Sequence, residues 1–313
     1  MNKCLLSLAF TTFLLAQRPP AHFQGTLLEF STYHTPVGAL DFQPFFYGIY
    51  EYGEYTDNWK VDKQPSRWEI QGQYYIETGL LDPWFDATLI LNNYYKMQGS
   101  QKSAALGDTF LELGYQICEQ SKTYLGPSLR LILQQGFPTG KFNQLEPNKI
   151  ETDITGTGTY ETALIFVTQQ NVNSPAVNWG YNTALGYQYF YPTNVLGMNA
   201  YGGGFGTSGT VNPGNQFYFA LGLQFEITQN WSFINDFQYT HLEADTFTGN
   251  PGINPDGTPA TVGGPSSDIF LLAPGFAYTI DNWLGISFGS WFTVAGRNTE
   301  AFVSSILTIA FSF

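Results

Sequence analysis

Residues 301–313 read AFVSSILTIAFSF, and this closing stretch decides the fold class of the chain. Bulky apolar residues such as Val303, Leu307 and Phe311 alternate with smaller residues such as Ser304 and Thr308. Successive side chains of a β-strand point to opposite faces, so one face of this segment can meet lipid while the other meets a polar lumen. The pattern is typical of the last strand of a bacterial outer-membrane β-barrel.

The composition favours the same fold. Aromatic residues make up 17% of the 313 residues and charged residues only 12%, whereas ordinary soluble domains carry about 25% charged residues. After the N-terminus, apolar side chains are interleaved with polar ones and do not form the run of about 18 apolar residues that a spanning helix needs. Only a closed barrel lets such strands cross a bilayer with every backbone polar group paired.

The N-terminus carries the features of an export signal. Met1-Asn2-Lys3 precedes an apolar run over 4–16, which predicts a signal peptide over 1–21 that is cleaved after Ala16 or Ala21. We expect residues 22–41 to form a periplasmic N-terminal segment or a plug, and residues 42–313 to form the outer-membrane barrel. The net charge of −13 argues against nucleic acid as a partner, because the field of the protein repels polyanions.

Period-two alternation bounded by turn residues predicts an all-β, antiparallel transmembrane barrel of about twelve strands. The predicted strands lie near 42–52, 68–78, 84–95, 108–118, 127–136, 159–169, 177–190, 216–227, 231–242, 268–279, 283–294 and 301–313. Adding 194–204 alone would give an odd number of strands, so we expect that segment to lie in a loop. Fourteen strands is the alternative count.

The connections alternate in length, as expected for a barrel with short periplasmic turns and longer external loops. Segments 79–83, 228–230 and 279–283 are short, while 119–126 and 170–176 are intermediate. Segments 53–67, 96–107, 137–158, 191–215 and 243–267 are long and rich in Gly, Pro, Asn and Thr. Aromatic residues near the predicted strand ends, such as Trp68 and Trp231, suit interfacial girdles; a soluble sandwich or propeller is the alternative reading of these aromatics.

Several short motifs carry a family resemblance. Gly107-Asp108 opens a strand that runs through 113–115 (LGY), and Pro127 leads a strand that ends in 137–140 (FPTG); 273–275 (APG) and Tyr278 follow later. With these motifs, the chain from about residue 104 to its end resembles the outer-membrane family named for the MetA pathway of phenol degradation. The resemblance implies a channel-like outer-membrane barrel associated with uptake of aromatic or other hydrophobic compounds.

Motifs that suggest chemistry each have a simpler structural explanation. Segment 136–141 (GFPTGK) is one residue short of a phosphate-binding loop, and Phe142 stands in place of its Ser or Thr. His241, Glu243 and Asp245 would point the same way from a strand, as metal ligands do, but any polar strand tip has this spacing. Segment 254–257 (NPDG) resembles half of a calcium loop and fits a type I turn. We predict no metal site and no cofactor.

A lipid-modifying enzyme is the weakest of the functional hypotheses. Such an enzyme needs a nucleophilic serine with a histidine base. His22 and His34 precede the predicted barrel, which leaves His241 as the one base candidate, and the sequence has no Gly-x-Ser-x-Gly motif. We therefore predict a protein that is not an enzyme and has no catalytic residue.

The polar faces of the predicted strands define the candidate site, which is the lumen. Acidic and amide residues dominate these faces, with Arg130 as the only basic residue placed in a predicted strand and Glu112 as its expected partner, because an unpaired buried charge is costly. We predict that the lumen prefers cations or neutral polar-aromatic solutes over anions; filling of a narrow barrel is the alternative role of these side chains. The lumen and selectivity residues are Glu69, Gln71, Gln73, Glu112, Gln116, Arg130, Gln134, Glu161, Asn182, Glu226 and Asp236, and the same faces carry Glu77, Asp86, Asn92, Asn178, Gln188, Gln224 and Gln238.

The remaining basic residues fall mainly in the predicted external connections. They are Lys60, Lys63, Arg67, Lys96, Lys102, Lys141, Lys149 and Arg297. Lysine and arginine bind phosphate readily, so we expect contacts with lipopolysaccharide as well as with outer-membrane lipid; ordinary solvated loop charge is the alternative. The C-terminal Phe313 predicts recognition by the barrel-assembly machinery.

These features predict an outer-membrane channel or transporter for small solutes, and we expect the Gly-rich segment 202–204 to narrow it. Small solutes would pass by diffusion through the lumen. The alternative is a non-conducting surface barrel whose loops bind or adhere to partners.

Overall fold

The computed structural model describes residues 27–28, 31–81, 84–121, 124–173, 177–281 and 283–313. The predicted signal peptide, with both candidate cleavage points, lies outside the described residues, as do 22–26 and 29–30 of the predicted N-terminal segment. Within the described ranges, no helix is both long enough and apolar enough to cross a membrane.

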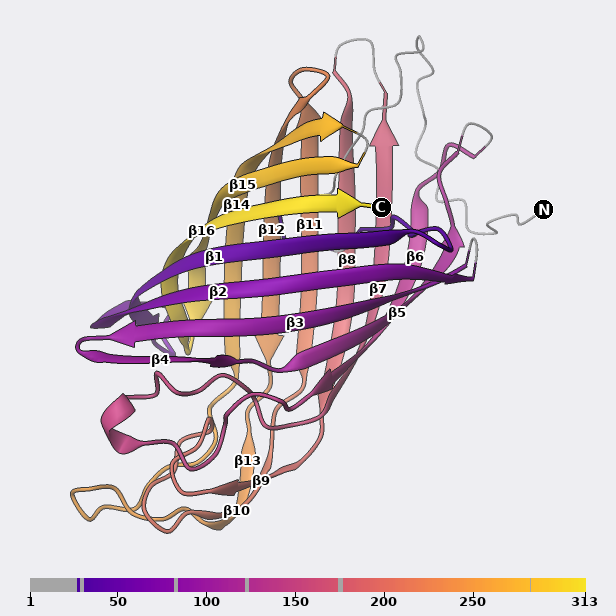
Figure 1. The fold of residues 1–313 in the computed structure, drawn as a ribbon. Coiled ribbons are helices and arrows are strands. Elements are labelled where there is room, and N and C mark those ends of the chain that lie inside the picture. Colours follow the sequence, from indigo (N-terminus) through magenta and orange to yellow (C-terminus); the bar gives the residue numbers. More distant parts are fainter. Residues whose placement is uncertain (1–26, 29–30, 82–83, 122–123, 174–176, 282) are drawn as a thin grey trace.

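The described chain forms one antiparallel sheet that closes on itself (Figure 1). The sheet runs in the order β2-β1-β16-β15-β14-β12-β11-β8-β7-β6-β5-β3, and pairing of β2 with β3 closes the cylinder. Its thirteenth strand, β4 (Gln101–Leu106), forms a hairpin arm on β3, so the described residues place twelve strands in the wall. The twelve-stranded antiparallel barrel predicted from the alternation is therefore confirmed.

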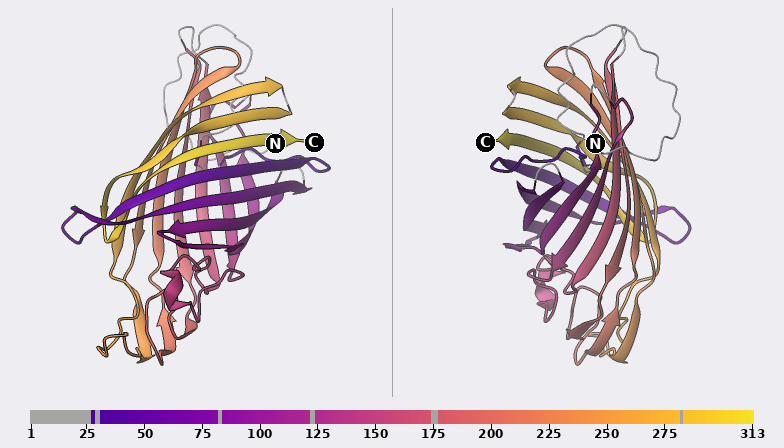
Figure 2. Two further views of the ribbon diagram at one scale, coloured as in Figure 1. Left: turned by 60° about the vertical axis from the view of Figure 1, so that its left-hand side comes forward. Right: turned by 90° about the vertical axis from the view of Figure 1, so that its right-hand side faces the viewer.

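The wall strands are β1 (Leu40–Tyr55), β2 (Val61–Leu81), β3 (Phe85–Gln98), β5 (Thr109–Cys118), β6 (Ser128–Phe137), β7 (Glu161–Val172), β8 (Trp179–Phe190), β11 (Gln216–Glu226), β12 (Trp231–Leu242), β14 (Ser267–Asp281), β15 (Leu284–Arg297) and β16 (Thr299–Ser312). β1 pairs with β16 along its whole length, from Asp41 opposite Ser312 to Tyr55 opposite Thr299. In Figure 1, β1, β2 and β3 run almost across the view while β7, β8 and β11 stand nearly upright, and Figure 2 shows the same crossing from two other sides. Closing a sheet requires such tilted strands.

The two ends of the barrel differ. Short connections gather at the upper end of Figure 1, and the long connections gather at the lower end. There β9 (Thr193–Leu196), β10 (Ser208–Asn212) and β13 (Thr246–Asn250) form a second small sheet, and η1 (Pro147–Lys149) is a single helical turn. Segment 194–204 thus belongs to a loop, as predicted. Because bacterial barrels place their longer loops outside the cell, we assign the lower end as external.

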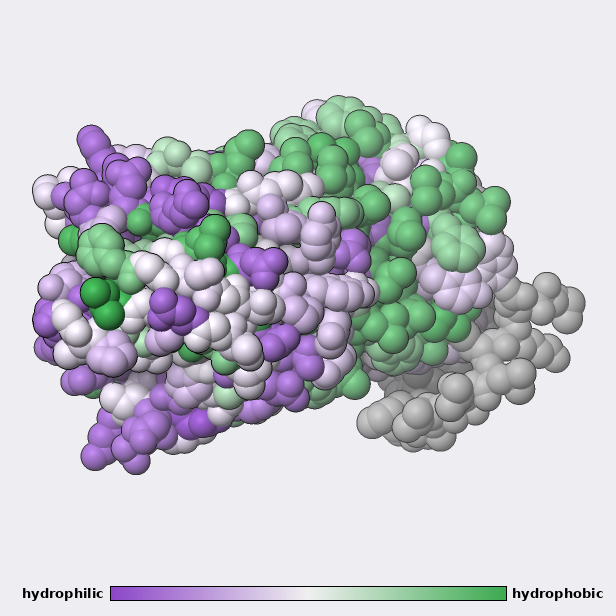
Figure 3. Space-filling view, turned by 90° about the horizontal axis from the view of Figure 1, so that it is seen from below, coloured by the Kyte–Doolittle hydropathy of each residue, from purple (hydrophilic) through white to green (hydrophobic). Residues whose placement is uncertain are grey.

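The outer face of the wall is apolar. Leu164 of β7, Leu185 of β8 and Ile70 of β2 are about half exposed, whereas the neighbouring lumen-side residues Asn182 and Glu69 are buried. Viewed from the external end, Figure 3 shows hydrophilic and intermediate residues over the loops and hydrophobic residues gathered at one side of the body. An apolar wall with a polar end matches a barrel that sits in lipid.

The inner face has apolar and polar sectors. Tyr47, Ile234, Leu271 and Ile306 belong to a buried cluster on the inside of β1, β12, β14 and β16, and Leu27 of the N-terminal segment packs into it. Carboxylates and amides occupy much of the inside of β2, β3, β5, β6 and β7. The lumen is therefore amphipathic rather than uniformly polar.

Several strands are longer than predicted, which corrects the expected position of the basic residues. Most of segment 53–67 is strand, with a turn only over 56–60, and most of 96–107 belongs to the hairpin of β3 and β4. Lys63, Arg67, Lys96, Lys102 and Arg297 therefore lie in strands, so the prediction that Arg130 is the only basic strand residue was wrong. Where β2 extends past the wall, residues 61–66 are exposed, and the apolar alternation that identifies a membrane strand is lost there.

Candidate functional site

The structure places the predicted lumen residues on the inner face of the wall. Glu69, Glu112, Gln116, Arg130, Glu161, Asn182 and Asp236 are buried, while Gln71, Gln73, Gln134 and Glu226 are partly buried. Their inward direction follows from the strand period, since their sequence neighbours face outward. These residues come from strands all around the barrel, and the contacts below divide them into two groups.

The first group surrounds Arg130 in the periplasmic half of the lumen. Its guanidinium contacts the Asp86 carboxylate, and Glu77 lies 3.7 Å away. The predicted partner Glu112 instead accepts a hydrogen bond of 2.6 Å from Gln134. The register explains this correction, because Arg130 stands opposite Gln116 whereas Glu112 stands four residues further along β5.

Gly114 provides the space in which Arg130 reaches Asp86. This glycine lies on β5 between the two strands that carry the pair, directly opposite Asp86. A Cβ atom at residue 114 would overlap both the Asp86 carboxylate and the Arg130 guanidinium. A side chain as small as alanine would therefore displace the ion pair.

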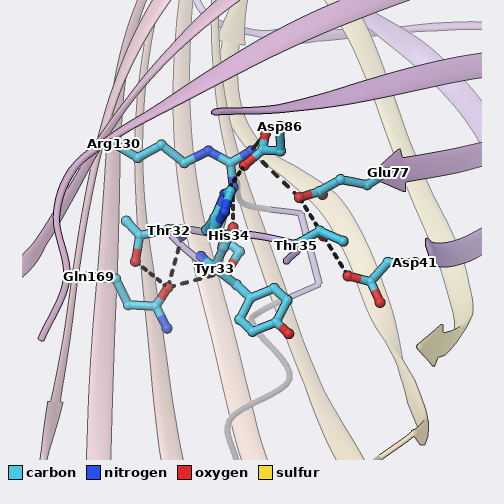
Figure 4. Close-up of polar contacts among 10 residues, drawn as sticks. Thr32, Tyr33, His34, Thr35, Asp41, Glu77, Asp86, Arg130 and Gln169 are labelled. Carbon is cyan, nitrogen blue, oxygen red and sulfur yellow. Dashed lines mark hydrogen bonds and ion pairs between the residues drawn. The ribbon is translucent and has the colours of Figure 1, made fainter. Parts of the chain in front are cut away.

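The described part of the N-terminal segment lies within this half of the lumen and contacts the same group (Figure 4). His34 Nδ1 lies 3.0 Å from Asp86, and the Tyr33 carbonyl accepts a hydrogen bond from Arg130. The Thr35 hydroxyl lies 2.6 Å from Asp41 and 2.8 Å from Glu77.

Two further contacts extend the attachment of the segment around the barrel. The Thr32 backbone N–H donates to Gln169 of β7 at 3.1 Å. The Leu28 backbone N–H donates to Asp236 of β12 at 2.9 Å. Residues 27–28 and 31–35 are thus attached to the wall on several sides, and they occupy space inside the barrel.

The second group pairs carboxylates with amides: two pairs lie toward the external end, and the third, Asn178 with Glu226, lies at the periplasmic ends of β8 and β11. Gln134 donates to Glu112, Gln188 donates to Glu161, and Asn178 donates to Glu226. Among the described residues, none of these three carboxylates forms an ion pair. The lumen therefore keeps negative charge that no lysine or arginine neutralises directly.

Two other acidic residues are balanced by cations. Glu69 lies 3.1 Å from Lys96, and Glu51 lies 2.8 Å from Arg67. These pairs lie toward the external ends of β1, β2 and β3. They limit the acidic excess there without removing it.

The external connection 138–160 folds against the lumen and is held by Asp108. The buried Asp108 carboxylate accepts hydrogen bonds from the backbone N–H of Gly140 at 2.8 Å and of Thr157 at 2.7 Å. The rim motif Gly107-Asp108 thus fixes a loop, and it is followed directly by β5. Lys141, in the segment with a partial likeness to a phosphate loop, contacts Asp153 at 2.6 Å.

A cavity of about 350 Å³ lies between this loop and the wall. It is lined by Gln73, Tyr75, Ile90, Phe110, Gln134, Thr157, Glu161, Gln188, Phe190 and Gln216. Four of these were predicted to face the lumen, and the fold brings them together: Gln73, Gln134, Glu161 and Gln188. Phe110, Phe190 and Thr157 could not be predicted as lining residues. An inward aromatic residue has the same alternation as a core residue, and a loop residue has no alternation.

His241, Glu243 and Asp245, whose spacing resembles that of metal ligands, do not converge. His241 lies on the outer side of the wall, with Nδ1 at 2.7 Å from Asp268. Asp245 accepts backbone hydrogen bonds from Gly214 at 3.0 Å and Gly264 at 2.8 Å, and Glu243 lies 3.3 Å from Asn215. Each side chain thus has a separate structural partner.

Comparison with solved structures relates the chain to outer-membrane barrels. It is similar to an outer membrane channel from Pseudomonas putida F1, with a TM-score of 0.70, 11% identity, and coverage of 91% of this chain and 100% of the channel. It also matches the β domain of the Bordetella autotransporter BrkA, with a TM-score of 0.48, 11% identity, and coverage of 88% and 99%. The likeness to the channel shows a shared fold, and with the apolar wall it identifies an outer-membrane β-barrel.

No family model and no curated protein sequence matches the chain. The resemblance to the MetA-pathway family therefore stays a prediction, while membership of the broad class of outer-membrane barrels rests on the fold.

Proposed function

We propose that the protein is an outer-membrane channel through which small solutes diffuse, with a preference for cations and neutral solutes over anions. The observation that carries this proposal is the pairing of Glu112, Glu161 and Glu226 with amides instead of cations. A lumen with an acidic excess attracts cations and repels anions. Diffusion requires no catalytic group, so the proposal does not include an enzymatic activity.

The aromatic lining of the cavity supports a role for solutes with apolar rings. Tyr75, Phe110 and Phe190 face the cavity together with Ile90. Such a lining is compatible with the aromatic or hydrophobic compounds that the MetA-pathway resemblance implies. We include these compounds in the proposed range of solutes.

Recording from planar bilayers tests the proposal. A gradient of potassium chloride across the membrane gives a reversal potential, and we expect its sign to show cation preference. Anion preference would overturn the selectivity. Absence of conductance at every voltage would favour the second candidate function, a surface barrel whose loops bind partners.

The second candidate function also has structural support. Residues 32–35 of the N-terminal segment lie within the periplasmic half of the lumen (Figure 4), and the loops build the small sheet of β9, β10 and β13 outside the wall. An occupied lumen with organised loops suits a surface anchor. Conductance of the purified protein distinguishes the two functions.

Lipopolysaccharide contacts remain part of the proposal for the external end. Arg67, Lys96, Lys141 and Arg297 have carboxylate partners. Lys60, Lys63 and Lys102 are exposed, and we propose that they contact the phosphates of lipopolysaccharide. We also propose that the barrel-assembly machinery recognises Phe313, which is 69% exposed.

A further inference from the structure

Four glutamine side chains surround the cavity in the external half of the lumen. Gln73 comes from β2, Gln134 from β6, Gln188 from β8 and Gln216 from β11. Each amide offers two N–H donors and a carbonyl acceptor. A cavity lined by four amides from four strands has hydrogen-bonding groups on several sides.

Contacts within the wall fix the direction of three of these amides. Gln216 donates to the Gln188 carbonyl at 3.3 Å, and Gln188 in turn donates to Glu161. Gln134 donates to Glu112 at 2.6 Å. A carboxylate can only accept hydrogen bonds when ionised, so it holds the amide nitrogen toward the wall. The amides are thereby held in place before any solute enters.

The amides keep unused capacity on the cavity side. The Gln73 carbonyl accepts from the hydroxyls of Tyr47 and Tyr75, at 3.4 and 3.3 Å. Among the described residues, the Gln73 amide nitrogen and the Gln134 carbonyl have no hydrogen-bond partner. One supplies donors and the other an acceptor, so the cavity can satisfy a solute group that does both.

Apolar side chains complete the lining. Ile90, Phe110 and Phe190 lie among the amides, and Tyr75 adds a ring whose hydroxyl is already engaged with Gln73. Aromatic rings offer broad apolar faces. The cavity therefore combines hydrogen-bonding edges with flat apolar surfaces.

We propose that this cavity is a binding site for a neutral, polyhydroxylated ring of about the size of a monosaccharide. Hydroxyl groups both donate and accept, as the amides do, and a saturated ring has an apolar face for the aromatic side chains. Glu112 and Glu161 disfavour an anion. A hydrocarbon would leave the Gln73 amide nitrogen and the Gln134 carbonyl unpaired, and buried polar groups without partners are costly. The volume lies at the lower end of the range of small-molecule sites.

The proposal rests on the proposed channel function only for the route by which the solute enters. Binding is therefore measured apart from conduction, by titration calorimetry of the full protein in detergent. The probes are methyl β-D-glucoside, gluconate as a charged polyol, and cyclohexanol as a ring with a single hydroxyl. We expect the glucoside to bind at least about tenfold more tightly than either of the others, which corresponds to about 1.4 kcal/mol.

Variants locate the site. Q188L and Q73L act on opposite parts of the lining, and each is expected to weaken glucoside binding about tenfold. Q135L is the matched control, because Gln135 neighbours Gln134 on β6 but points to the other face. The circular dichroism spectrum and melting temperature of each variant verify its folding.

The outcomes separate the two proposals. Glucoside binding that both variants weaken, in a protein without conductance, would support the site and overturn the channel. Conductance together with equal binding of glucoside and cyclohexanol would overturn the site and leave the channel. Unchanged glucoside binding in folded Q188L and Q73L would also overturn the site.

Discussion

Asp86 and Glu161 are both buried on the inner wall of the same barrel, yet they have different kinds of partner. Asp86, in the periplasmic half, contacts the charged Arg130 and lies beside His34 of the N-terminal segment. Glu161, in the external half, accepts a hydrogen bond from the neutral Gln188. Near Asp86 the described N-terminal residues 31–35 contact the wall, whereas Glu161 has no basic partner among the described residues and lines a cavity. We infer that the periplasmic half holds the N-terminal segment and that the external half contacts the solute.

The largest expected effect comes from removing the cation of the periplasmic half. R130M leaves Asp86, which is 1% exposed, without its guanidinium, and loss of one partner of a buried ion pair costs about 3–5 kcal/mol. Urea unfolding of the protein in detergent measures the change. The double variant R130M/D86L is expected to recover part of the loss, because it removes the orphaned charge as well.

E112Q is the matched change in the external half. A glutamine at residue 112 can still accept the Gln134 hydrogen bond through its carbonyl, so this variant is expected to cost no more than about 1 kcal/mol. Equal losses in R130M and E112Q would contradict the distinction between the halves.

A second change tests the space around the ion pair. G114A places a methyl group where the Asp86 and Arg130 side chains meet, and overpacking of a filled interior costs about 1–3 kcal/mol. In G264A the new Cβ has its nearest neighbour at 3.7 Å, which is an ordinary contact, so we expect a change within about 0.5 kcal/mol. The same unfolding assay compares the two variants.

These residues also show how far the sequence could predict the structure. The alternation located β11 and β12 almost to the residue, because lipid on one side and the lumen on the other impose a strict period of two. The alternation could not predict the Arg130–Asp86 ion pair. That contact depends on the register of β5 against β6 and on a bare backbone at Gly114, and the register follows from turn geometry rather than from the face that a residue occupies.

The contacts of the loop residues could not be predicted from the sequence either. Asp108 stood out only as a rim residue, whereas the structure shows that it holds Gly140 and Thr157, far away in the sequence. The sequence predicts segment 53–67, at the end of the β1–β2 hairpin, as loop because residues 61–66 are exposed and have no apolar face. Likewise, His34 and Thr35 precede the first strand, where no period relates them to the wall.

The attachment of the N-terminal segment predicts an effect on conduction. The double variant H34A/T35V removes the side-chain contacts with Asp86, Asp41 and Glu77 while leaving those wall residues in place. Each lost hydrogen bond to a charged group is worth about 1.5–3 kcal/mol, and 1.4 kcal/mol is a tenfold change in a population. We expect the open time of single channels to rise roughly tenfold or more. An unchanged open time would mean that the segment does not obstruct the path.

The smallest expected effect concerns the charge of the external half. E161Q removes one carboxylate beside the cavity and keeps its shape. A unit charge at about 4 Å is worth about 1 kcal/mol in water, so the ratio of cation to anion permeability should fall by roughly two- to fivefold. The reversal potential in a salt gradient measures this ratio. E54Q is the control, since Glu54 lies in the exposed end of the β1–β2 hairpin, where salt screens its charge from the lumen. If E54Q lowers the ratio as much as E161Q does, selectivity arises from the charge of the external surface and not from the carboxylates of the lumen.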